Sequence, residues 1–304
     1  MYSLSTCWNS HRHTDGRAML REIRDLGFEY AELSHGTRIS LMPGILDAVD
    51  SGEIKISTLH NFCPLPMGIT GSAPNVYKFS AERDRERESA IKHTLKTLDF
   101  AVRVKAPVVV THSGSIEMKD YTDKLLKMVG HKQRGTFKYL NLCDDFVHKR
   151  DSLKKEYFQR TIDTLKKMLP EVEKRGLKLG LENRQALEEL PIESDYLELF
   201  RELNSAAAVY WHDTGHAQIK ENLGFIHHGL HLESLQSHLA GFHIHDVQFP
   251  GDDHCQPGTG IINFAALKRL VKPKHIKVFE FSPKLTVEEV KAGVAHIKAT
   301  WGEG

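Results

Sequence analysis

Short runs rich in β-branched and aromatic residues alternate along this chain with longer segments of helical periodicity. The runs predicted to be strands are residues 2–6, 30–34, 54–61, 107–112, 177–183, 207–213, 241–247 and 276–281. Helical patterns cover residues 16–26, 43–50, 83–104, 153–175, 194–203, 264–270 and 287–300. Strands connected through helices pair in parallel, and eight such strands can close into a barrel. The alternation therefore predicts an α/β fold, a single (β/α)₈ TIM barrel.

The length of the chain agrees with one barrel domain covering residues 1–304, since such a domain needs about 250 residues. Two connections, at about 62–80 and 114–151, are longer than usual and are expected to be long loops, the second partly helical. An open doubly wound sheet is the alternative fold. No Gly-x-Gly-x-x-Gly motif follows the first predicted strand, which argues against the dinucleotide-binding version of that sheet.

Charge and apolar patterning limit the partners to be expected. Lys and Arg number 41 against 40 Asp and Glu, so the net charge gives no general attraction to nucleic acid or membrane. There is no apolar run of about 18 residues and no signal-peptide pattern at the N-terminus, and the four cysteines are far apart. We expect a cytoplasmic protein with reduced thiols and no membrane partner. Homo-oligomer formation is left open.

Metal-ligating residue types stand at the ends of six consecutive predicted strands. They are His60, His112, Glu182, Asp213, His243 and Glu280. The carboxyl ends of barrel strands meet on one face, where the active sites of such barrels lie. Carboxylates buried close together cost several kcal/mol unless a cation compensates them. A mixed histidine and carboxylate set suits Zn²⁺, Mn²⁺, Co²⁺ or Fe²⁺, so the pattern predicts a divalent-metal site on this face.

Further polar residues lie close to these strand ends. His216 follows Asp213 by three residues, and Asp252 and His254 stand in a loop after the seventh strand. His243 and His245 are two apart, so both side chains point to the same side of a strand. One of the pair is expected to be a ligand. For the other, a substrate contact and a plain hydrogen bond are equally open.

Several short motifs in this order resemble the xylose isomerase-like barrel superfamily. They are Leu-Glu-Asn at 181–183, Asp-x-x-His at 213–216, His-x-x-Asp at 243–246, Pro-Gly-x-Gly at 257–260 and a late Phe-Glu at 279–280. The superfamily contains sugar phosphate isomerases and epimerases, and also the endonuclease IV-type nucleases that act on abasic DNA (AP endonuclease family 2). The resemblance covers nearly the whole chain.

The two branches of the superfamily imply different metal contents. In the epimerase branch one metal is held by Glu, Asp, His and Glu, which correspond to Glu182, Asp213, His243 and Glu280. The endonuclease branch holds three metals. Its additional ligands fall on residue types that are all present in this chain: His60, His112, His216, Asp252 and His254. One ion is expected, and up to three are compatible with the sequence. The opening segment and the segment after His60 depart from the endonuclease pattern.

The favoured hypothesis is a metal-dependent sugar isomerase or epimerase that removes a proton next to a carbonyl to give an enediolate. Glu182 and Glu280 are expected to be the base and acid, with His216, His245 and Arg184 as substrate contacts. A dehydratase or lyase acting on a keto-sugar would share the first step. The alternative is a three-metal phosphodiesterase acting on abasic DNA, although near-neutral charge fits a small sugar better than a duplex.

Overall fold

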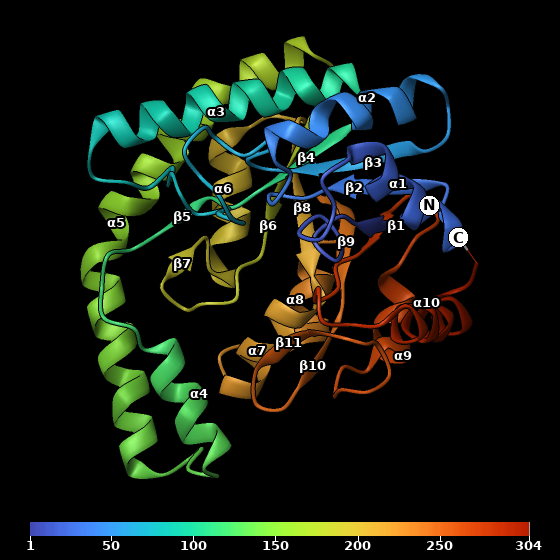
Figure 1. The fold of residues 1–304 in the computed structure, drawn as a ribbon. Coiled ribbons are helices and arrows are strands. Elements are labelled where there is room, and N and C mark those ends of the chain that lie inside the picture. Colours follow the sequence, from blue (N-terminus) through green and yellow to red (C-terminus); the bar gives the residue numbers. More distant parts are fainter. Residues whose placement is uncertain (304) are drawn as a thin grey trace.

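The computed structural model describes residues 1–303, which form a closed barrel of eight parallel strands surrounded by helices (Figure 1). The order of the strands around the barrel is β1-β12-β9-β8-β6-β4-β3-β2. Their bounds are Tyr2–Ser5 (β1), Tyr30–Leu33 (β2), Lys55–His60 (β3), Val108–Thr111 (β4), Lys178–Glu182 (β6), Ala208–Asp213 (β8), Leu239–Ile244 (β9) and Ile276–Phe279 (β12). All eight predicted strands are present. The predicted barrel is therefore confirmed, and the open sheet is ruled out.

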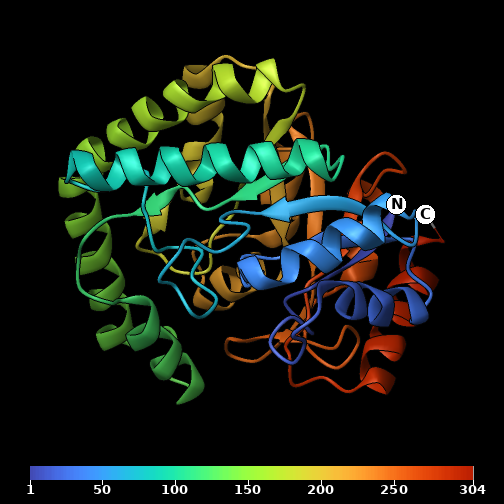
Figure 2. The same ribbon diagram turned by 45° about the horizontal axis from the view of Figure 1, so that its top comes forward.

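The helices form the outer layer, as Figures 1 and 2 show. Their bounds are Gly16–Asp25 (α1), Met42–Asp50 (α2), Asp84–Arg103 (α3), Thr122–Gly130 (α4), Phe137–Lys174 (α5), Tyr196–Leu203 (α6), Thr214–Leu223 (α7), His228–Ser234 (α8), Phe264–Leu267 (α9) and Val287–Trp301 (α10). Short 3₁₀ turns lie at Ile39–Leu41 (η1), Glu193–Asp195 (η2) and Lys268–Leu270 (η3). Helix starts follow local capping rules. Asp15 caps α1, and Thr286 forms a capping box with Glu289 at the start of α10.

Three helical features differ from the sequence-based prediction. Helix α5 starts at Phe137, well before the predicted start at residue 153, so that much of the long connection at 114–151 is helical. Tyr139 and Phe146 on its early turns are buried against the rest of the fold, and this packing stabilises the extension. Helices α7 and α8 were not predicted. Nine of the ten residues of α7 are buried, and this helix therefore lacks the one-sided apolar pattern that identifies a helix in a sequence.

Two small antiparallel ribbons stand beside the barrel. Gly114–Ser115 (β5) pairs with Glu189–Leu190 (β7), and Asp246–Gln248 (β10) pairs with Asp252–Cys255 (β11). Each ribbon begins close to the carboxyl end of a barrel strand, β4 and β9 respectively. The predicted seventh strand at 241–247 is therefore divided in two, the first part in the barrel and the second in a ribbon. The connection at 62–80 is a loop without helix or strand, as predicted.

A large apolar core packs the strands against the helices, and a smaller apolar cluster consists of Val108, Val110, Trp211, Ile276 and Val278. Side chains such as Leu4, Leu59, Val109 and Leu181 are fully or almost fully buried. Within the described residues, no helix is both long and apolar enough to cross a bilayer. The buried polar side chains include Glu182, Asp213, His243 and Glu280 at the carboxyl ends of the strands.

Candidate metal centre

The four predicted ligands meet at the carboxyl end of the barrel. Glu182 ends β6, Asp213 ends β8, His243 lies one residue before the end of β9, and Glu280 directly follows β12. Each offers one ligand atom, and these four atoms all lie within 4.8 Å of one another. All four side chains are almost completely buried. The strand register explains the convergence, since Asp213 on β8 stands opposite His243 on β9 in the ladder.

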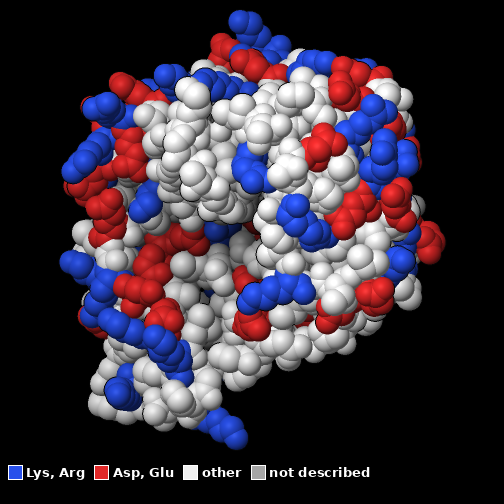
Figure 3. Space-filling model, in the orientation of Figure 1, with Lys and Arg blue, Asp and Glu red and all other residues white. Residues whose placement is uncertain are grey.

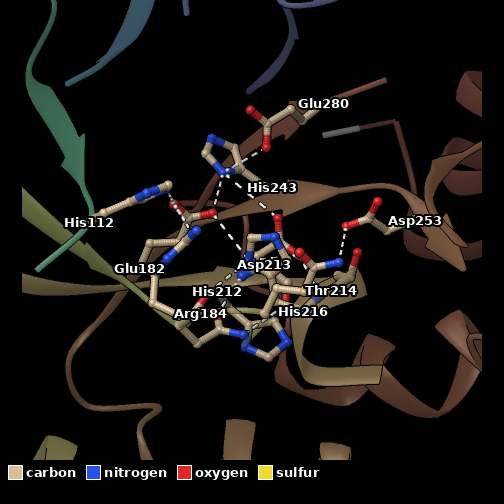
Figure 4. A network of polar contacts seen from close by, with 12 residues as sticks. His112, Glu182, Arg184, His212, Asp213, Thr214, His216, His243, Asp253 and Glu280 are labelled. Atoms are coloured by element: carbon tan, nitrogen blue, oxygen red, sulfur yellow. Dashed lines mark hydrogen bonds and ion pairs between the residues drawn. The ribbon is translucent and has the colours of Figure 1, made fainter. Parts of the chain in front are cut away.

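His243 lies between the carboxylates, as Figure 4 shows. Its Nδ1 is 2.9 Å from Oε1 of Glu182, 3.2 Å from Oε2 of Glu280 and 4.0 Å from Oδ2 of Asp213. Burial by itself would lower the pKa of this imidazole, but the negative charges of Glu280, Glu32 and Glu182 raise that pKa well above its usual value. The carboxylates thus hold a positive charge at the point where the four ligand atoms meet.

The carboxylates show the complementary effect. Burial would raise the pKa of Glu182 and Glu280, but the neighbouring charge of His243 holds both pKa values well below the usual range. Three ionised carboxylates and one imidazole nitrogen form a donor set that fits a divalent transition-metal ion. Such an ion would take the place of the proton on Nδ1 of His243. The residues present therefore fit a metal, while their role as ligands stays a prediction.

Asp213 is held by several contacts at once. Its Oδ1 accepts a hydrogen bond from the backbone N–H of His216 at 2.7 Å and so caps helix α7. Its Oδ2 lies 3.0 Å from Nε2 of His245. The side chain of Asn183 bonds the Asp213 backbone on both sides, accepting from its N–H and donating to its carbonyl. The Leu-Glu-Asn and Asp-x-x-His motifs are therefore one connected unit in the structure.

His60 and His112 contact the other oxygen of Glu182. Their Nε2 atoms lie 3.2 Å and 3.1 Å from Oε2 of Glu182, whereas Oε1 faces His243. Burial and then the charge of Arg184 lower the pKa of His112 to about 3, so this imidazole is neutral. Both histidines belong to the same polar cluster as the four predicted ligands.

The predicted residues of the loop after β9 are only partly brought to the site. His254 approaches it, with Nε2 at 3.8 Å from Oε2 of Glu280. Asp252 is exposed, and the neighbouring Asp253 instead pairs with His254 at 3.1 Å. The backbone at His254 has a positive φ of 55°, so β11 departs there from the regular alternation of side chains along a strand. A spacing argument could not tell which of the two aspartates pairs with His254.

The three predicted substrate contacts differ in whether a side-chain nitrogen is available for a further hydrogen bond. His216 donates from Nδ1 to the carbonyl of Asn183 at 2.9 Å, which leaves its Nε2 available. His245 accepts a hydrogen bond at Nδ1 from the backbone N–H of His254 and donates from Nε2 to Asp213. Both of its nitrogens are therefore occupied, which fits a hydrogen-bonding role for His245 and not a substrate contact.

Arg184 is buried beside the four predicted ligands. Its Nε donates to Glu189 at 3.2 Å, and its Nη1 lies 3.4 Å from Oε2 of Glu182 without forming a hydrogen bond to any described residue. Figure 4 shows its guanidinium on the same side of Glu182 as His112. A buried donor without a partner is costly, and a substrate oxygen would satisfy it.

Two further residues near the centre were not identified from the sequence. Glu32 on β2 is fully buried and contacts His243 from the opposite side. His35, just after β2, packs its ring edge-on against His60 with the ring centres 4.7 Å apart. The first two strands carried no metal-ligating residue at their predicted ends. Glu32 lies in the middle of the predicted strand at 30–34, where an inward carboxylate could have been the signal.

A cavity of about 580 Å³ opens beside these residues. Its lining includes His35, Arg38, His254, Glu280 and Lys284. Figure 3 shows this face of the molecule hollowed near its centre, with acidic side chains along one side of the hollow. The cavity has charged side chains in its lining and is large enough for a small organic substrate.

Comparison with known proteins gives a consistent result. A family model described as xylose isomerase-like TIM barrel matches residues 20–299. An uncharacterized protein of Methanocaldococcus jannaschii is 23% identical over 280 residues, which cover 91% of this chain and 90% of that protein. A D-tagatose 3-epimerase-like protein has a TM-score of 0.70 at 17% identity, covering 98% of this chain and 96% of that one. A 3-keto-D-glucoside 4-epimerase of E. coli has a TM-score of 0.70 at 12% identity, covering 98% of both chains.

Proposed function

The chain belongs to the xylose isomerase-like TIM barrel family, and on that basis we propose that it is a divalent-metal-dependent sugar isomerase or epimerase. The observation that carries the proposal is the arrangement of Glu182 and Glu280. Their carboxylates come from β6 and the end of β12, with β8 and β9 between them, and both face the same point as Asp213 and His243. Structural similarity to several sugar epimerases supports the same reaction class.

In the proposed reaction a hydroxy-ketone lies between the two glutamates. A bound divalent cation held by Glu182, Asp213, His243 and Glu280 would polarise the carbonyl oxygen. One glutamate, in its ionised form, removes the proton from the carbon next to the carbonyl. The other returns a proton to the resulting enediolate, after taking up that proton from water. The free Nε2 of His216 and the free Nη1 of Arg184 are available to hold substrate oxygens. Elimination of water from an oxidised sugar would use the same first step.

One observation favours the second candidate, a phosphodiesterase of the endonuclease IV type. The two oxygens of Glu182 face different partners, Oε1 facing His243 and Oε2 facing His60 and His112. A carboxylate divided in this way can bridge two ions, as two-metal sites require. The exposed position of Asp252 and the balanced charge of the chain favour the sugar enzyme instead.

The deciding experiment combines metal analysis of the purified protein with a substrate panel. The panel contains ketoses, sugar acids, keto-glycosides and an oligonucleotide duplex with an abasic site, and the sugars are incubated in D₂O. One ion per chain together with deuterium exchange into a sugar is the expected result. Three ions per chain together with cleavage of the duplex would replace the first proposal by the second. If the protein contains no metal and no sugar exchanges deuterium, both proposed functions are contradicted.

A further inference from the structure

Glu32 is a carboxylate in the interior of the barrel that the proposed reaction does not use. Its side chain is fully buried. Oε2 accepts hydrogen bonds from Oγ1 of Thr58 at 2.7 Å and from Nε2 of His243 at 3.1 Å. Oε1 has no hydrogen-bond partner among residues 1–303. A buried carboxylate with one unsatisfied oxygen destabilises a fold by several kcal/mol unless it is compensated, so its presence needs a reason.

We propose that Glu32 is a positioning residue that fixes both the orientation and the tautomer of His243 for metal binding. By accepting from Nε2–H, Glu32 keeps the proton on that nitrogen and leaves Nδ1 as the atom that faces Glu182 and Glu280. A carboxylate acceptor also makes the imidazole a stronger donor to a cation than a neutral acceptor would. The inference rests on the proposed function, because it presupposes that a metal binds there.

Comparison with the other histidines of the site shows what is particular to this one. His60 and His216 each use Nδ1 to donate to the carbonyl of a nearby residue, so that Nε2 is the nitrogen left for other contacts, and in His60 it faces Oε2 of Glu182. His243 does the reverse, since its Nδ1 faces the carboxylates and its Nε2 faces away. Its partner is a charged side chain from a distant strand. This arrangement requires a dedicated acceptor behind the ring.

The geometry of the barrel makes that acceptor possible. Strands β9 and β2 are separated by β12 and β1, so the contact between His243 and Glu32 reaches across the barrel interior. Thr58 stands beside Glu32 in the β2–β3 ladder, and its hydroxyl holds Oε2 in place. Glutamine has nearly the same shape as glutamate and could fill this position. Packing alone therefore does not require a charge here.

The test compares Glu32→Gln with Asp195→Asn in the full-length protein. Asp195 is also buried, but it pairs with Arg150 at 2.8 Å and with Lys154, on the outside of the barrel. The dissociation constant for Co²⁺ is measured by competition with a chelator, and the visible absorption of bound Co²⁺ reports on the ligands. We expect Glu32→Gln to raise the dissociation constant by about 10- to 100-fold and to shift the absorption bands. Asp195→Asn should change neither, although it lowers thermal stability.

The outcomes separate this inference from the proposed function. If the unchanged protein binds Co²⁺ and Glu32→Gln binds it within about twofold of the same affinity, the positioning role is wrong while the metal site stands. If the unchanged protein binds neither Co²⁺ nor another divalent ion, the proposed function fails, and this inference fails with it. Should Glu32→Gln not fold, Thr58→Val takes its place. Loss of one hydrogen bond to Glu32 should then raise the dissociation constant by about fivefold, and an unchanged affinity would overturn the inference.

Discussion

Two groups of buried histidines lie on the two sides of strand β8. The inner cluster consists of His60, His112, Glu182, Asp213, His243 and Glu280, at the mouth of the barrel. The outer cluster consists of Tyr210, His212, Gln218, His228 and His231, between β8 and helices α7 and α8. Because side chains alternate along a strand, His212 and Asp213 are neighbours in sequence but belong to different clusters. Burial is nearly complete in both.

The outer cluster forms a hydrogen-bonded chain of neutral groups. Nδ1 of His228 donates to Gln218 at 3.3 Å, and Nε2 of His212 donates to Nε2 of His228 at 2.9 Å. The hydroxyl of Tyr210 donates to Nδ1 of His212 at 2.8 Å and accepts from His231 at 2.8 Å. Each nitrogen in this chain is used once, as donor or acceptor. The direction of donation follows from Gln218, whose amide group donates to Asn222 and so leaves its carbonyl oxygen as an acceptor.

His243 in the inner cluster differs from the outer histidines in the direction of its pKa shift, whereas the pKa of His112, at the edge of the inner cluster, is lowered as theirs are. In the outer cluster burial lowers the pKa of His228 to about 3 and that of His231 to about 4. In the inner cluster burial acts on His243 in the same direction, but the surrounding carboxylates raise its pKa well above the usual value. The number of histidines therefore says little about function. The carboxylates beside them determine whether a cluster holds positive charge.

The largest expected effect is a loss of turnover when the inner cluster is changed, with no such loss when the outer cluster is changed. Glu182→Gln should lower turnover at least about a thousandfold, because it removes both a ligand and a proton-transfer group. The fold should persist, since glutamine fills the same space, and circular dichroism with thermal unfolding checks this. The matched variant in the outer cluster, His231→Gln, should keep its turnover. Full activity of Glu182→Gln would refute the role assigned to Glu182.

The second prediction concerns stability at low pH, where the outer cluster, and not the inner one, is expected to have the effect. The folded-state pKa of His231 is about 4, below the value of 6.5 for an unperturbed histidine, so the unfolded chain binds a proton first as the pH falls. The stability from a neutral His231 is complete above about pH 6.5 and is lost as the pH falls toward 4. The loss is on the order of 3 kcal/mol for this group alone.

Urea unfolding measured between pH 7 and pH 4 tests this prediction. His231→Gln removes the titrating group, while its amide can still donate to Tyr210. The free energy of unfolding of that variant should fall less steeply with pH than that of the unchanged protein. Equal slopes in the two proteins would show that His231 does not contribute to acid sensitivity.

The sequence identified the residues of the inner cluster, but none of the outer cluster. The barrel followed from the alternation of strands and helices, and the convergence of six candidate residues followed from their places at strand ends. The choice of four ligands among them followed from the family resemblance. Glu32 was missed because it lies inside a predicted strand, whereas the candidate ligands were sought at strand ends. The outer cluster was also missed, since His228 and His231 lie on helix α8, which has no recognisable periodicity of its own. Asp252 and Asp253 could not be distinguished without the actual direction of β11.

The third prediction is that a divalent ion stabilises the folded protein through the inner cluster. An ion present at about 100 times its dissociation constant should add about 2.7 kcal/mol to the free energy of unfolding. Thermal unfolding with and without a chelator measures the difference. Glu182→Gln should show little of this stabilisation, whereas His231→Gln should show all of it. Equal stabilisation of both variants would place the ion elsewhere.

The smallest expected effect concerns His112, which lies at the edge of the inner cluster. Its Nδ1 is 2.6 Å from Oδ1 of Asn75 and its Nε2 is 3.1 Å from Oε2 of Glu182, so it contacts one of the four predicted ligands without being one of them. In a one-ion enzyme His112→Gln should lower kcat less than about tenfold, because the amide of glutamine can occupy this position and donate a hydrogen bond to Glu182. The number of ions per chain should stay the same. In a multi-metal enzyme the same change removes a ligand, so the metal content should fall and turnover should be lost. Steady-state kinetics and metal analysis of this one variant therefore test whether the histidines around Glu182 form a polar wall or a second metal position.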